Sequence, residues 1–413
     1  MKIVDPATAV AALEDGTNVI FPAACANPTR FFDAFSNQVD RFTNLTVCSG
    51  LSFGDYRFLD KGLGDHFHYM TWQAALSIRH LFKQPERKKV SFVPIRLADL
   101  PGTIRRGGPI EPDAVVVQTS TPQNDGTVNL GISVGTYQHY IRESRIVIAE
   151  MNPNMPVTCG DSKVALDAID FAFESDTPLA NYPIGEAAER DEKIVQNVLS
   201  LIPEGAWVQF GVGAVPDRTL AELASIKNTN LFSGLLSQSL MTYLETVKHD
   251  PRVINGELAG DKQLYDYCHL DSRISMQGTN VTHNPAELAK LDRFISINSA
   301  IEIDLHGQSN GETLGPVQIS GVGGSLDYIE AAAQSAGGVS IIAMPSTTAG
   351  DKRSKIVAAL AAGSVVTTPR FCIDHVVTEY GIARLRGKNL WQRADALIEI
   401  AHPKFRDELA NAL

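Results

Sequence analysis

Short runs of valine, isoleucine and other apolar residues recur along the whole chain, and amphipathic stretches such as 28–42 and 325–336 separate them. Within most runs apolar and polar residues do not alternate, which indicates strands buried on both faces of a parallel sheet. Amphipathic stretches between such strands predict helices that cover the sheet. The predicted strands are NVIF (18–21), LTVC (45–48), VSFVPI (90–95), AVVVQT (114–119), RIVIAE (145–150), WVQF (207–210), RFISIN (293–298), SIIAMP (340–345), SVVTT (364–368) and HVVTEY (375–380).

The chain has 413 residues, more than one ordinary domain holds, so two domains are expected. The polar segment SDTPLANYPIGEAAERDE (175–192) is the best linker candidate. With a boundary near residue 188, the sequence predicts two open parallel-sheet α/β domains, 1–188 and 189–413.

Composition narrows the classes of function. Apolar residues make up 44% of the chain, but no run is long enough for a membrane span, and the N-terminus lacks the apolar region of a secretory signal. A net charge of −11 argues against a nucleic-acid partner. The five cysteines are widely spaced and odd in number, so neither a disulfide framework nor a metal site is expected. We therefore expect a cytoplasmic protein without a bound metal.

Two glycine-rich loops are the main candidates for ligand binding. GVGAVPD (211–217) follows a predicted strand and precedes a predicted helix, so Gly211, Val212 and Gly213 can bring backbone amides close to an anion. It is not a dinucleotide fingerprint, because Pro216 stands where the third glycine would be.

GVGGSLD (321–327) also opens a helix, and the amides around Gly323 and Gly324 suit an oxyanion hole or a phosphate. Taken singly, each of the two loops could equally be a structural turn.

Isolated polar residues are weaker candidates. Glu302 and Asp304 alternate on a predicted strand and could do acid–base work, although structural carboxylates are commoner. Lys355, predicted at the start of a helix, could meet a phosphate or lie in solvent. His283 and Cys372 are isolated, and packing is the ordinary role of such residues.

Many separated segments, in order, resemble the acetyl-CoA hydrolase/4-hydroxybutyrate CoA-transferase family over nearly the whole chain. They include AEMNPNMPVTCGDS (149–162), GVGAVPD, KQLYDY (262–267), ISINSAIEIDLHGQ (295–308), SGVGGSLDYI (320–329) and VVTEYGIARLRGKNL (376–390). The resemblance implies two α/β domains of the CoA-transferase type and coenzyme A as part of an acyl-CoA substrate. It also implies a small-molecule acceptor and a homo-oligomer, such as a dimer.

The family's mechanism, as the resemblance implies it, is covalent catalysis by a glutamate. The carboxylate attacks the acyl-CoA thioester, free CoA then gives a glutamyl-CoA thioester, and CoA passes to a second carboxylate. Gly323 and Gly324 would hold the thioester oxyanion, and residues 211–217 would line the reacting carbonyl. Met344 to Ser346 and Lys355 would contact the CoA chain and its phosphates.

The nucleophile itself is missing. NLFSGLLSQSLMTYLE (230–245) predicts a strand end running into a helix, with Ser233 and Gly234 at the junction. In the family pattern that the sequence resembles, the glutamate lies seventeen residues after the aspartate of the glycine loop. That aspartate is Asp217 here, so Gly234 stands at the position of the glutamate. Other departures from the family pattern are Phe232, Gln238, Ser239, His283, Ala165 and the Arg370–Cys372 segment. Because the glycine loops are kept, the pattern indicates a repurposed site in which removal of the carboxylate leaves room for a ligand.

Three functions follow from this interpretation. The first is an acyl-CoA enzyme without a glutamyl-CoA intermediate, which performs acyl transfer to a small acceptor, hydrolysis, or decarboxylation or C–C bond chemistry. His283 is its first candidate for base or orienter, Glu302 the second and Cys372 the third. The second is a conventional CoA-transferase or acetyl-CoA hydrolase that uses another carboxylate. Glu302 is one such candidate, whereas Glu245 is disfavoured because it lies far along the helix. The third is a non-catalytic CoA-binding subunit.

Overall fold

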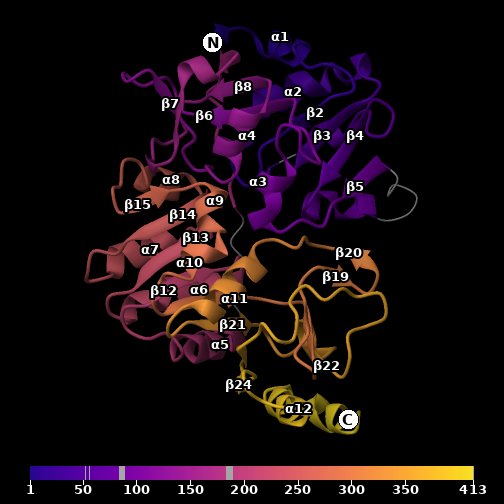
Figure 1. The fold of residues 1–413 in the computed structure, drawn as a ribbon, viewed down its shortest axis with the longest axis vertical. Coiled ribbons are helices and arrows are strands. Elements are labelled where there is room, and N and C mark those ends of the chain that lie inside the picture. Colours follow the sequence, from indigo (N-terminus) through magenta and orange to yellow (C-terminus); the bar gives the residue numbers. More distant parts are fainter. Residues whose placement is uncertain (52, 55, 83–88, 183–188, 413) are drawn as a thin grey trace. The chain divides into compact units, whose positions relative to one another are not determined.

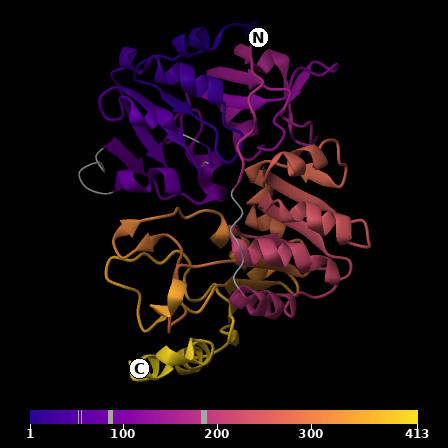
Figure 2. The same cartoon turned by 180° about the vertical axis from the view of Figure 1, so that it is seen from behind.

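The computed structural model describes residues 1–413 except 52, 55, 83–88, 183–188 and 413. Two compact units emerge, one of residues 1–183 with 254–282 and the other of residues 184–253 with 283–413. The predicted boundary at residue 188 lies outside the described residues. The chain can be followed in Figure 1 and, from behind, in Figure 2.

The first unit is built on an eight-stranded sheet of order β1-β11-β8-β6-β2-β3-β4-β5, in which every strand is parallel to its neighbour. Its strands and helices are β1 (Lys2–Ile3), α1 (Pro6–Ala11), β2 (Asn18–Ile20), α2 (Thr29–Ser36), β3 (Leu45–Ser49), β4 (Phe67–Thr71), β5 (Val90–Phe92), α3 (Leu100–Thr103), β6 (Ala114–Thr119), β7 (Thr127–Asn129), α4 (Tyr137–Glu143), β8 (Ile146–Met151), β9 (Cys159–Gly160), β10 (Lys163–Ala165), β11 (Phe171–Glu174), β14 (Val253–Ala259), α8 (Lys262–Tyr267), β15 (Ile274–Met276) and α9 (Thr279–Thr282).

Aromatic side chains form the core of this unit. Phe21, at the end of β2, packs against Phe31 and Phe35 of α2 with ring centroids 5.7 and 5.4 Å apart, and Phe58 closes the cluster. Buried aromatic rings of this size contribute a large apolar area, which stabilises the packing of α2 on the sheet. The central strand β6 is buried at every position, as the apolar run that opens its sequence AVVVQT predicts.

The second unit contains strands in the order β24-β23-β21-β16-β12-β13, all parallel except β24, which runs antiparallel to β23. Its strands and helices are α5 (Glu189–Leu199), β12 (Trp207–Phe210), α6 (Ala214–Glu222), β13 (Asn230–Ser237), α7 (Ser239–Thr246), α10 (Pro285–Leu288), β16 (Phe294–Asn298), β17 (Glu302–Asp304), β18 (Ser309–Asn310), β19 (Thr313–Leu314), β20 (Val317–Gln318), α11 (Ser325–Gln334), β21 (Val339–Ala343), β22 (Ile356–Val357), β23 (His375–Thr378), β24 (Gly381–Arg384), α12 (Leu390–Glu399) and α13 (Pro403–Ala410).

Helices α5, α6 and α7 pack on one another along the second unit's sheet, and α10 packs on α11, which contacts β16 and β21. The parallel α/β fold predicted from the apolar runs is thereby confirmed. One predicted strand is wrong: SVVTT (364–368) forms only an isolated bridge from Thr368 to Ser309, because Val365 and Val366 face solvent and build no ladder.

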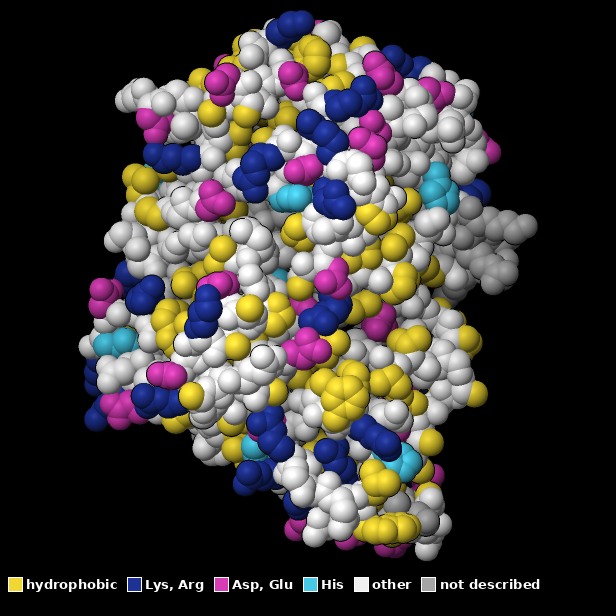
Figure 3. Space-filling model, in the orientation of Figure 1, with side chains coloured by type: hydrophobic (Ala, Val, Ile, Leu, Met, Phe, Trp, Pro, Cys, Tyr) yellow, Lys and Arg dark blue, Asp and Glu magenta, His cyan; other side chains and the backbone are white. Residues whose placement is uncertain are grey.

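The surface agrees with the mixed charge of the sequence. On the face shown in Figure 3, basic and acidic side chains are interspersed rather than gathered into a patch of one sign. Among the described residues, no helix combines the length and the apolar character that a membrane crossing requires.

Candidate functional site

The first glycine loop begins where β12 ends at Phe210. Gly213 has a φ of 126°, a conformation that favours glycine, and it starts α6 without a side-chain cap. Gly211 lies against Asn298, the last residue of β16, whose side chain is held 3.0 Å from the Gln209 side chain. The loop therefore presents uncapped helix amides beside the end of a neighbouring strand, as an anion site requires.

The second glycine loop leads into α11. Gly323 has a φ of 65°, and Gly324 is the N-cap residue of the helix, again without a side-chain hydrogen bond. Gly323 and Gly324 are half-buried, whereas Val212 in the first loop is exposed. Both loops can thus offer backbone N–H groups to a ligand oxygen.

Both loops lie at one edge of the second unit's sheet. Val208 of β12 pairs with Leu231 of β13, and the Ser233 hydroxyl donates to the Phe210 carbonyl over 3.0 Å. Helix α6 starts where β12 ends, and α11 runs back along the sheet into the amino end of the parallel strand β21. The starts of both helices and the carboxyl ends of the strands therefore share the edge at which α/β proteins bind ligands.

Gly234 lies within β13 at this edge, four residues before the strand passes into α7. The prediction of a strand-to-helix junction at Gly234 is therefore wrong, because β13 continues through Ser237. A Cβ atom on Gly234 would lie 2.6 Å from Nε2 of His283 and 2.7 Å from the Tyr328 hydroxyl, too close for ordinary packing. The expectation that the missing carboxylate leaves room is also wrong, because an imidazole and a phenol fill that space.

His283 and Tyr328 form a neutral pair. The Tyr328 hydroxyl and His283 Nε2 are 3.1 Å apart, and both side chains are buried. Burial lowers the pKa of His283 to about 3 and raises the pKa of Tyr328 well above its ordinary value, the latter with a smaller contribution from Asp327. At neutral pH the pair can donate or accept hydrogen bonds, but His283 is too weak a base to remove a proton efficiently.

Asp217 and Tyr328 were not singled out as chemistry by the sequence. Burial raises the pKa of Asp217 above its ordinary value, and a hydrogen bond from Ser237 opposes that rise. Its Oδ2 has no hydrogen-bond partner within the described residues. Tyr328 lies in the first turn of α11, directly after the second glycine loop. This position after the glycine loop was the one signal in the sequence for a role of Tyr328 in the site. The residue type gave none, since aromatic residues are ordinary in amphipathic helices.

Glu302 and Asp304 are structural carboxylates of the small sheet β18-β17-β22. Glu302 Oε1 accepts hydrogen bonds from Asn310 Nδ2 at 3.0 Å and Ser364 Oγ at 3.2 Å. Asp304 accepts backbone N–H groups of the following turn and the side-chain amide of Gln308. Their carboxylates are therefore already engaged in holding β17 and its turn.

Lys355, Met344 and Cys372 occupy different surroundings. Lys355 precedes β22 rather than a helix, contrary to the sequence expectation, because its carbonyl accepts the amide of Ile303 in a strand pairing. Burial and, to a smaller extent, the charge of Arg190 lower the pKa of Lys355 to about 8, and the charge of Glu379 opposes them. Met344 and Cys372 are buried in one hydrophobic cluster, so their side chains serve packing in this conformation.

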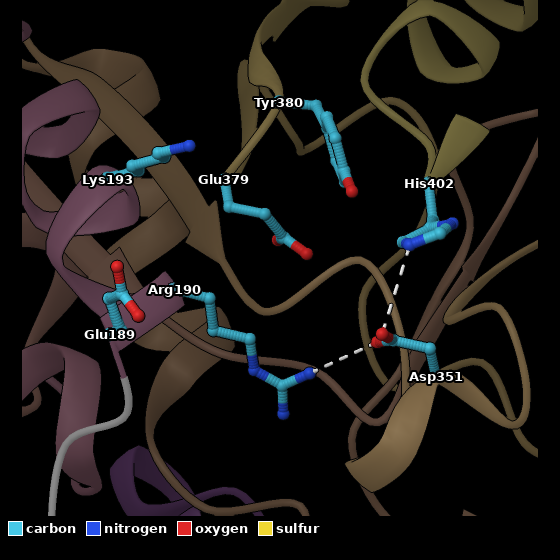
Figure 4. A pocket seen from close by; sticks show the side chains of 7 residues that line it. All are labelled: Glu189, Arg190, Lys193, Asp351, Glu379, Tyr380 and His402. Carbon is cyan, nitrogen blue, oxygen red and sulfur yellow. Dashed lines mark ion pairs between the residues drawn. The ribbon is translucent and has the colours of Figure 1, made fainter.

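A pocket opens where β21 and β23 end, at the same edge of the sheet. Figure 4 shows that its side chains converge from the start of α5 and from the segments after β21, β23 and α12. Asp351 pairs with Arg190 at 3.7 Å and with His402 at 3.9 Å, and Glu379 accepts hydrogen bonds from the amide and hydroxyl of Ser346. The lining residues are Glu189, Arg190, Lys193, Asp351, Glu379, Tyr380 and His402.

The first unit contains a carboxyl group that the sequence reasoning missed. Glu257 in β14 is half-buried, and burial raises its pKa to about 8. A carboxylate inside a mostly apolar strand, VINGELA (253–259), was its signal in the sequence. Within the described residues, no group of three or more metal-binding side chains is arranged to hold an ion.

Comparisons with known proteins agree with this architecture. The N-terminal domain model of acetyl-CoA hydrolase/transferase matches residues 1–181, and the C-terminal domain model matches residues 260–413. The 4-hydroxybutyrate coenzyme A transferase of Clostridium kluyveri is 33% identical, over 99% of this chain and 96% of its own.

Two solved structures are similar over nearly the full length. RipA from Yersinia pestis has a TM-score of 0.93 and 27% identity, covering 100% of this chain and 96% of RipA. The 4-hydroxybutyrate CoA-transferase from Porphyromonas gingivalis has a TM-score of 0.80 and 30% identity, covering 99% and 96% of the two chains. The resemblance noted in the sequence is thereby confirmed.

Proposed function

The chain belongs to the acetyl-CoA hydrolase/transferase family, and on this basis we propose that it acts on an acyl-CoA thioester without forming a glutamyl-CoA intermediate. The observation that carries the proposal is the neutral His283–Tyr328 pair in the space that a side chain at position 234 would need. Neither residue can serve as a carboxylate nucleophile. The acceptor therefore attacks the thioester carbonyl directly.

The kept glycine loops explain how the thioester is held. Amides around Gly323 and Gly324 stabilise the oxyanion that develops when the carbonyl is attacked, and the Tyr328 hydroxyl supplies a further donor one helical turn away. Gly211 and Gly213 line the other side of the carbonyl. The basic side chains Arg190 and Lys193 face the pocket near Lys355 and favour the CoA phosphates.

The weak basicity of His283 determines which acceptors suit the site. An alcohol or amine acceptor loses a proton as it attacks, and an imidazole with a pKa of about 3 assists this poorly. A carboxylate is already anionic at neutral pH and needs no base. Its oxygen forms a bond to the thioester carbon, the C–S bond breaks and CoA leaves as the thiolate. That thiolate then attacks the acceptor's carbonyl in the resulting anhydride, which releases the original acid and gives the new thioester.

A conventional mechanism with another carboxylate is the alternative. Glu302 serves it poorly, because both hydrogen bonds to its Oε1 come from structural side chains. A non-catalytic CoA-binding role is the third possibility, and it gives no reason for two uncapped glycine loops beside a hydroxyl donor.

Initial-rate kinetics with two substrates distinguish these functions. Acyl-CoA and carboxylate concentrations are varied over a panel of acyl groups, and CoA and product masses are followed. Direct attack requires both substrates to be bound together, so double-reciprocal plots intersect, whereas a covalent enzyme intermediate gives the parallel lines of ping-pong kinetics. Parallel lines would overturn the proposal. Loss of CO2 with CoA retained would show decarboxylation, and no turnover across the panel would show a binding protein.

A further inference from the structure

A carboxyl group in the first unit is enclosed without the partners that such a group needs. Among the described residues, Glu257 Oε2 has no hydrogen-bond partner, and neither has Ser133 Oγ, whose side chain is 2% exposed. Buried polar atoms in native proteins are nearly always hydrogen-bonded, and an unsatisfied one calls for an explanation. Two such atoms close together indicate a ligand or water that both can contact.

Backbone pairing places these two groups on one side of β14. Ser133 and Glu257 stand opposite each other in an antiparallel bridge, which the Leu258 amide supports by donating to the Ile132 carbonyl over 2.8 Å. Directly opposed residues in such a pair project to the same face. The serine hydroxyl and the carboxyl group therefore project from the same face of the paired strands.

The absence of a side chain at Gly135 leaves space for the carboxyl group of Glu257. A Cβ atom at position 135 would collide with Glu257 Oε1, and the backbone there has a φ of 29°. The amides of Val134 and Gly135 both donate to the Gly256 carbonyl, at 3.1 and 3.2 Å, so the loop is fixed over the strand. The carboxyl group is held against backbone on one side, and its Oε2 is buried although the residue as a whole is half-buried.

Among the residues that the structure describes, no positive charge contributes to the pKa of Glu257. Burial raises the pKa of Glu257 to about 8, and the interaction with the Ser133 hydroxyl partly opposes this rise. The titratable groups that interact with its charge are Tyr137 of α4 and Cys25 after β2, and Cys25 in turn contacts Tyr265 of α8. Burial raises the pKa values of Tyr137 and Tyr265 above the ordinary range and that of Cys25 to about 12, so all three are neutral near pH 7.

The surroundings are therefore a set of neutral O–H donors. Protonated Glu257 has one O–H group, Ser133 has another, and the Tyr137 hydroxyl accepts the amide of Ala23, which leaves its own hydrogen for another acceptor. A carboxylic acid kept protonated by an apolar setting is a strong donor toward a negatively charged oxygen. We propose that Glu257, Ser133 and Tyr137 bind the carboxylate group of a small organic acid.

This inference goes beyond the proposed function and does not rest on it, because the binding needs no thioester. It is tested by titrating the full chain with propionate, using propionamide as the uncharged counterpart, followed by ligand-observed NMR. Binding requires protonated Glu257 and ionised propionate, so affinity is constant between about pH 6 and about pH 8 and falls about tenfold for each pH unit above that range. Propionamide is expected to bind at least about tenfold more weakly, because the charge-assisted hydrogen bond is lost.

Two variants at position 257 sharpen the test. Glu257→Gln keeps an N–H donor, so binding near pH 7 is retained but the fall above pH 8 disappears. Glu257→Leu loses the donor and weakens binding by about tenfold or more. Glu143→Gln is the matched control, since Glu143 is also half-buried but already accepts the amide of Arg106 at 2.9 Å. It is expected to bind propionate as the wild type does.

Several results would overturn the proposal. They are equal affinity for propionate and propionamide, an affinity that does not change above pH 8, no saturable binding of propionate, and a Glu257→Leu variant that binds as well as wild type. If Glu257→Leu does not fold, the pH profile of Glu257→Gln against wild type decides the question.

Discussion

Gly234 and Glu257 show two opposite ways in which a strand of this protein treats a carboxylate. At Gly234 the side chain is absent and a hydrogen-bonded imidazole and phenol fill the place. At Glu257 a carboxyl group is present, and its Oε2 has no partner within the described residues. Burial keeps both places neutral near pH 7, by lowering the pKa of His283 and raising that of Glu257.

The two sites differ in whether their buried polar atoms have hydrogen-bond partners within the described residues. His283 and Tyr328 hydrogen-bond to each other and close the space at Gly234 to a side chain. In the tautomer in which His283 Nε2 donates, the Tyr328 hydroxyl keeps its own hydrogen for a ligand. Glu257 and Ser133 leave hydrogen-bonding capacity for a ligand. The comparison teaches that loss of an ionisable residue and burial of one can give the same neutral surface with different consequences for binding.

The largest expected effect comes from filling the space at position 234. Gly234→Ala puts a methyl group 2.6 Å from His283 Nε2 and 2.7 Å from the Tyr328 hydroxyl. We expect a loss of about 3 kcal/mol in the free energy of unfolding, measured in urea, because overpacked cores must shift side chains and backbone. Adding His283→Ala to this variant should recover part of the loss.

The matched control is Gly102→Ala, since a Cβ atom there has no neighbour within 4 Å. Its stability should change little. If Gly234→Ala were as stable as wild type, the space would be open and the interpretation of the pair would fail.

The second effect is on turnover. Tyr328→Phe removes the hydroxyl of a residue in the first turn of α11, the helix that follows the second glycine loop, while keeping the ring. If this hydroxyl stabilises the oxyanion, kcat should fall about 100-fold with little change in KM for the acyl-CoA. A loss of stability without a change in kcat would assign Tyr328 to packing alone.

The third effect concerns pH and stability. His283 takes up a proton near pH 6.5 when unfolded but only near pH 3 when folded. The unfolded state therefore binds the extra proton between these values. His283 should therefore contribute a fall of about 1.4 kcal/mol in the free energy of unfolding for each pH unit below about 6.5, until about pH 3.

His283→Asn should remove this slope, as urea unfolding at several pH values will show. His80→Asn is the control, because His80 is exposed. An unchanged slope in His283→Asn would contradict the assigned burial effect.

The smallest effect is expected at Glu302. Gln at this position still offers an oxygen to Asn310 and Ser364, which are 3.0 and 3.2 Å from the carboxylate. Glu302→Gln should therefore change kcat by less than about threefold, measured with the best acyl-CoA of the panel. A fall in kcat of about 100-fold would instead show that Glu302 supplies the carboxylate that takes part in the reaction.

Much of the fold could be predicted from the sequence, because parallel strands buried on both faces appear as short apolar runs without alternation. AVVVQT was predicted correctly since both of its faces are covered, whereas SVVTT is also rich in β-branched residues but faces solvent at Val365 and Val366. The two glycine loops were recognisable because each stands between a strand or irregular segment and a helix. Local pattern carries that much information.

The filling of the space at Gly234 could not be predicted. His283 is 45 residues before Tyr328, and no spacing or periodicity in the sequence indicates that they meet. Likewise, the isolation of Glu257 depends on the loop around Gly135, which is far away in the chain. Side-chain contacts between distant segments decide these sites, and composition does not encode them.

Intact-mass analysis during turnover tests the central claim most directly. The protein is mixed with an acyl-CoA that it converts, quenched within the first turnovers, and examined with and without borohydride, which traps a glutamyl-CoA thioester. If the acceptor attacks the thioester directly, the acyl-CoA is consumed while the protein keeps the mass of the unmodified chain. A CoA adduct, or a glutamate reduced by borohydride on any peptide, would contradict it.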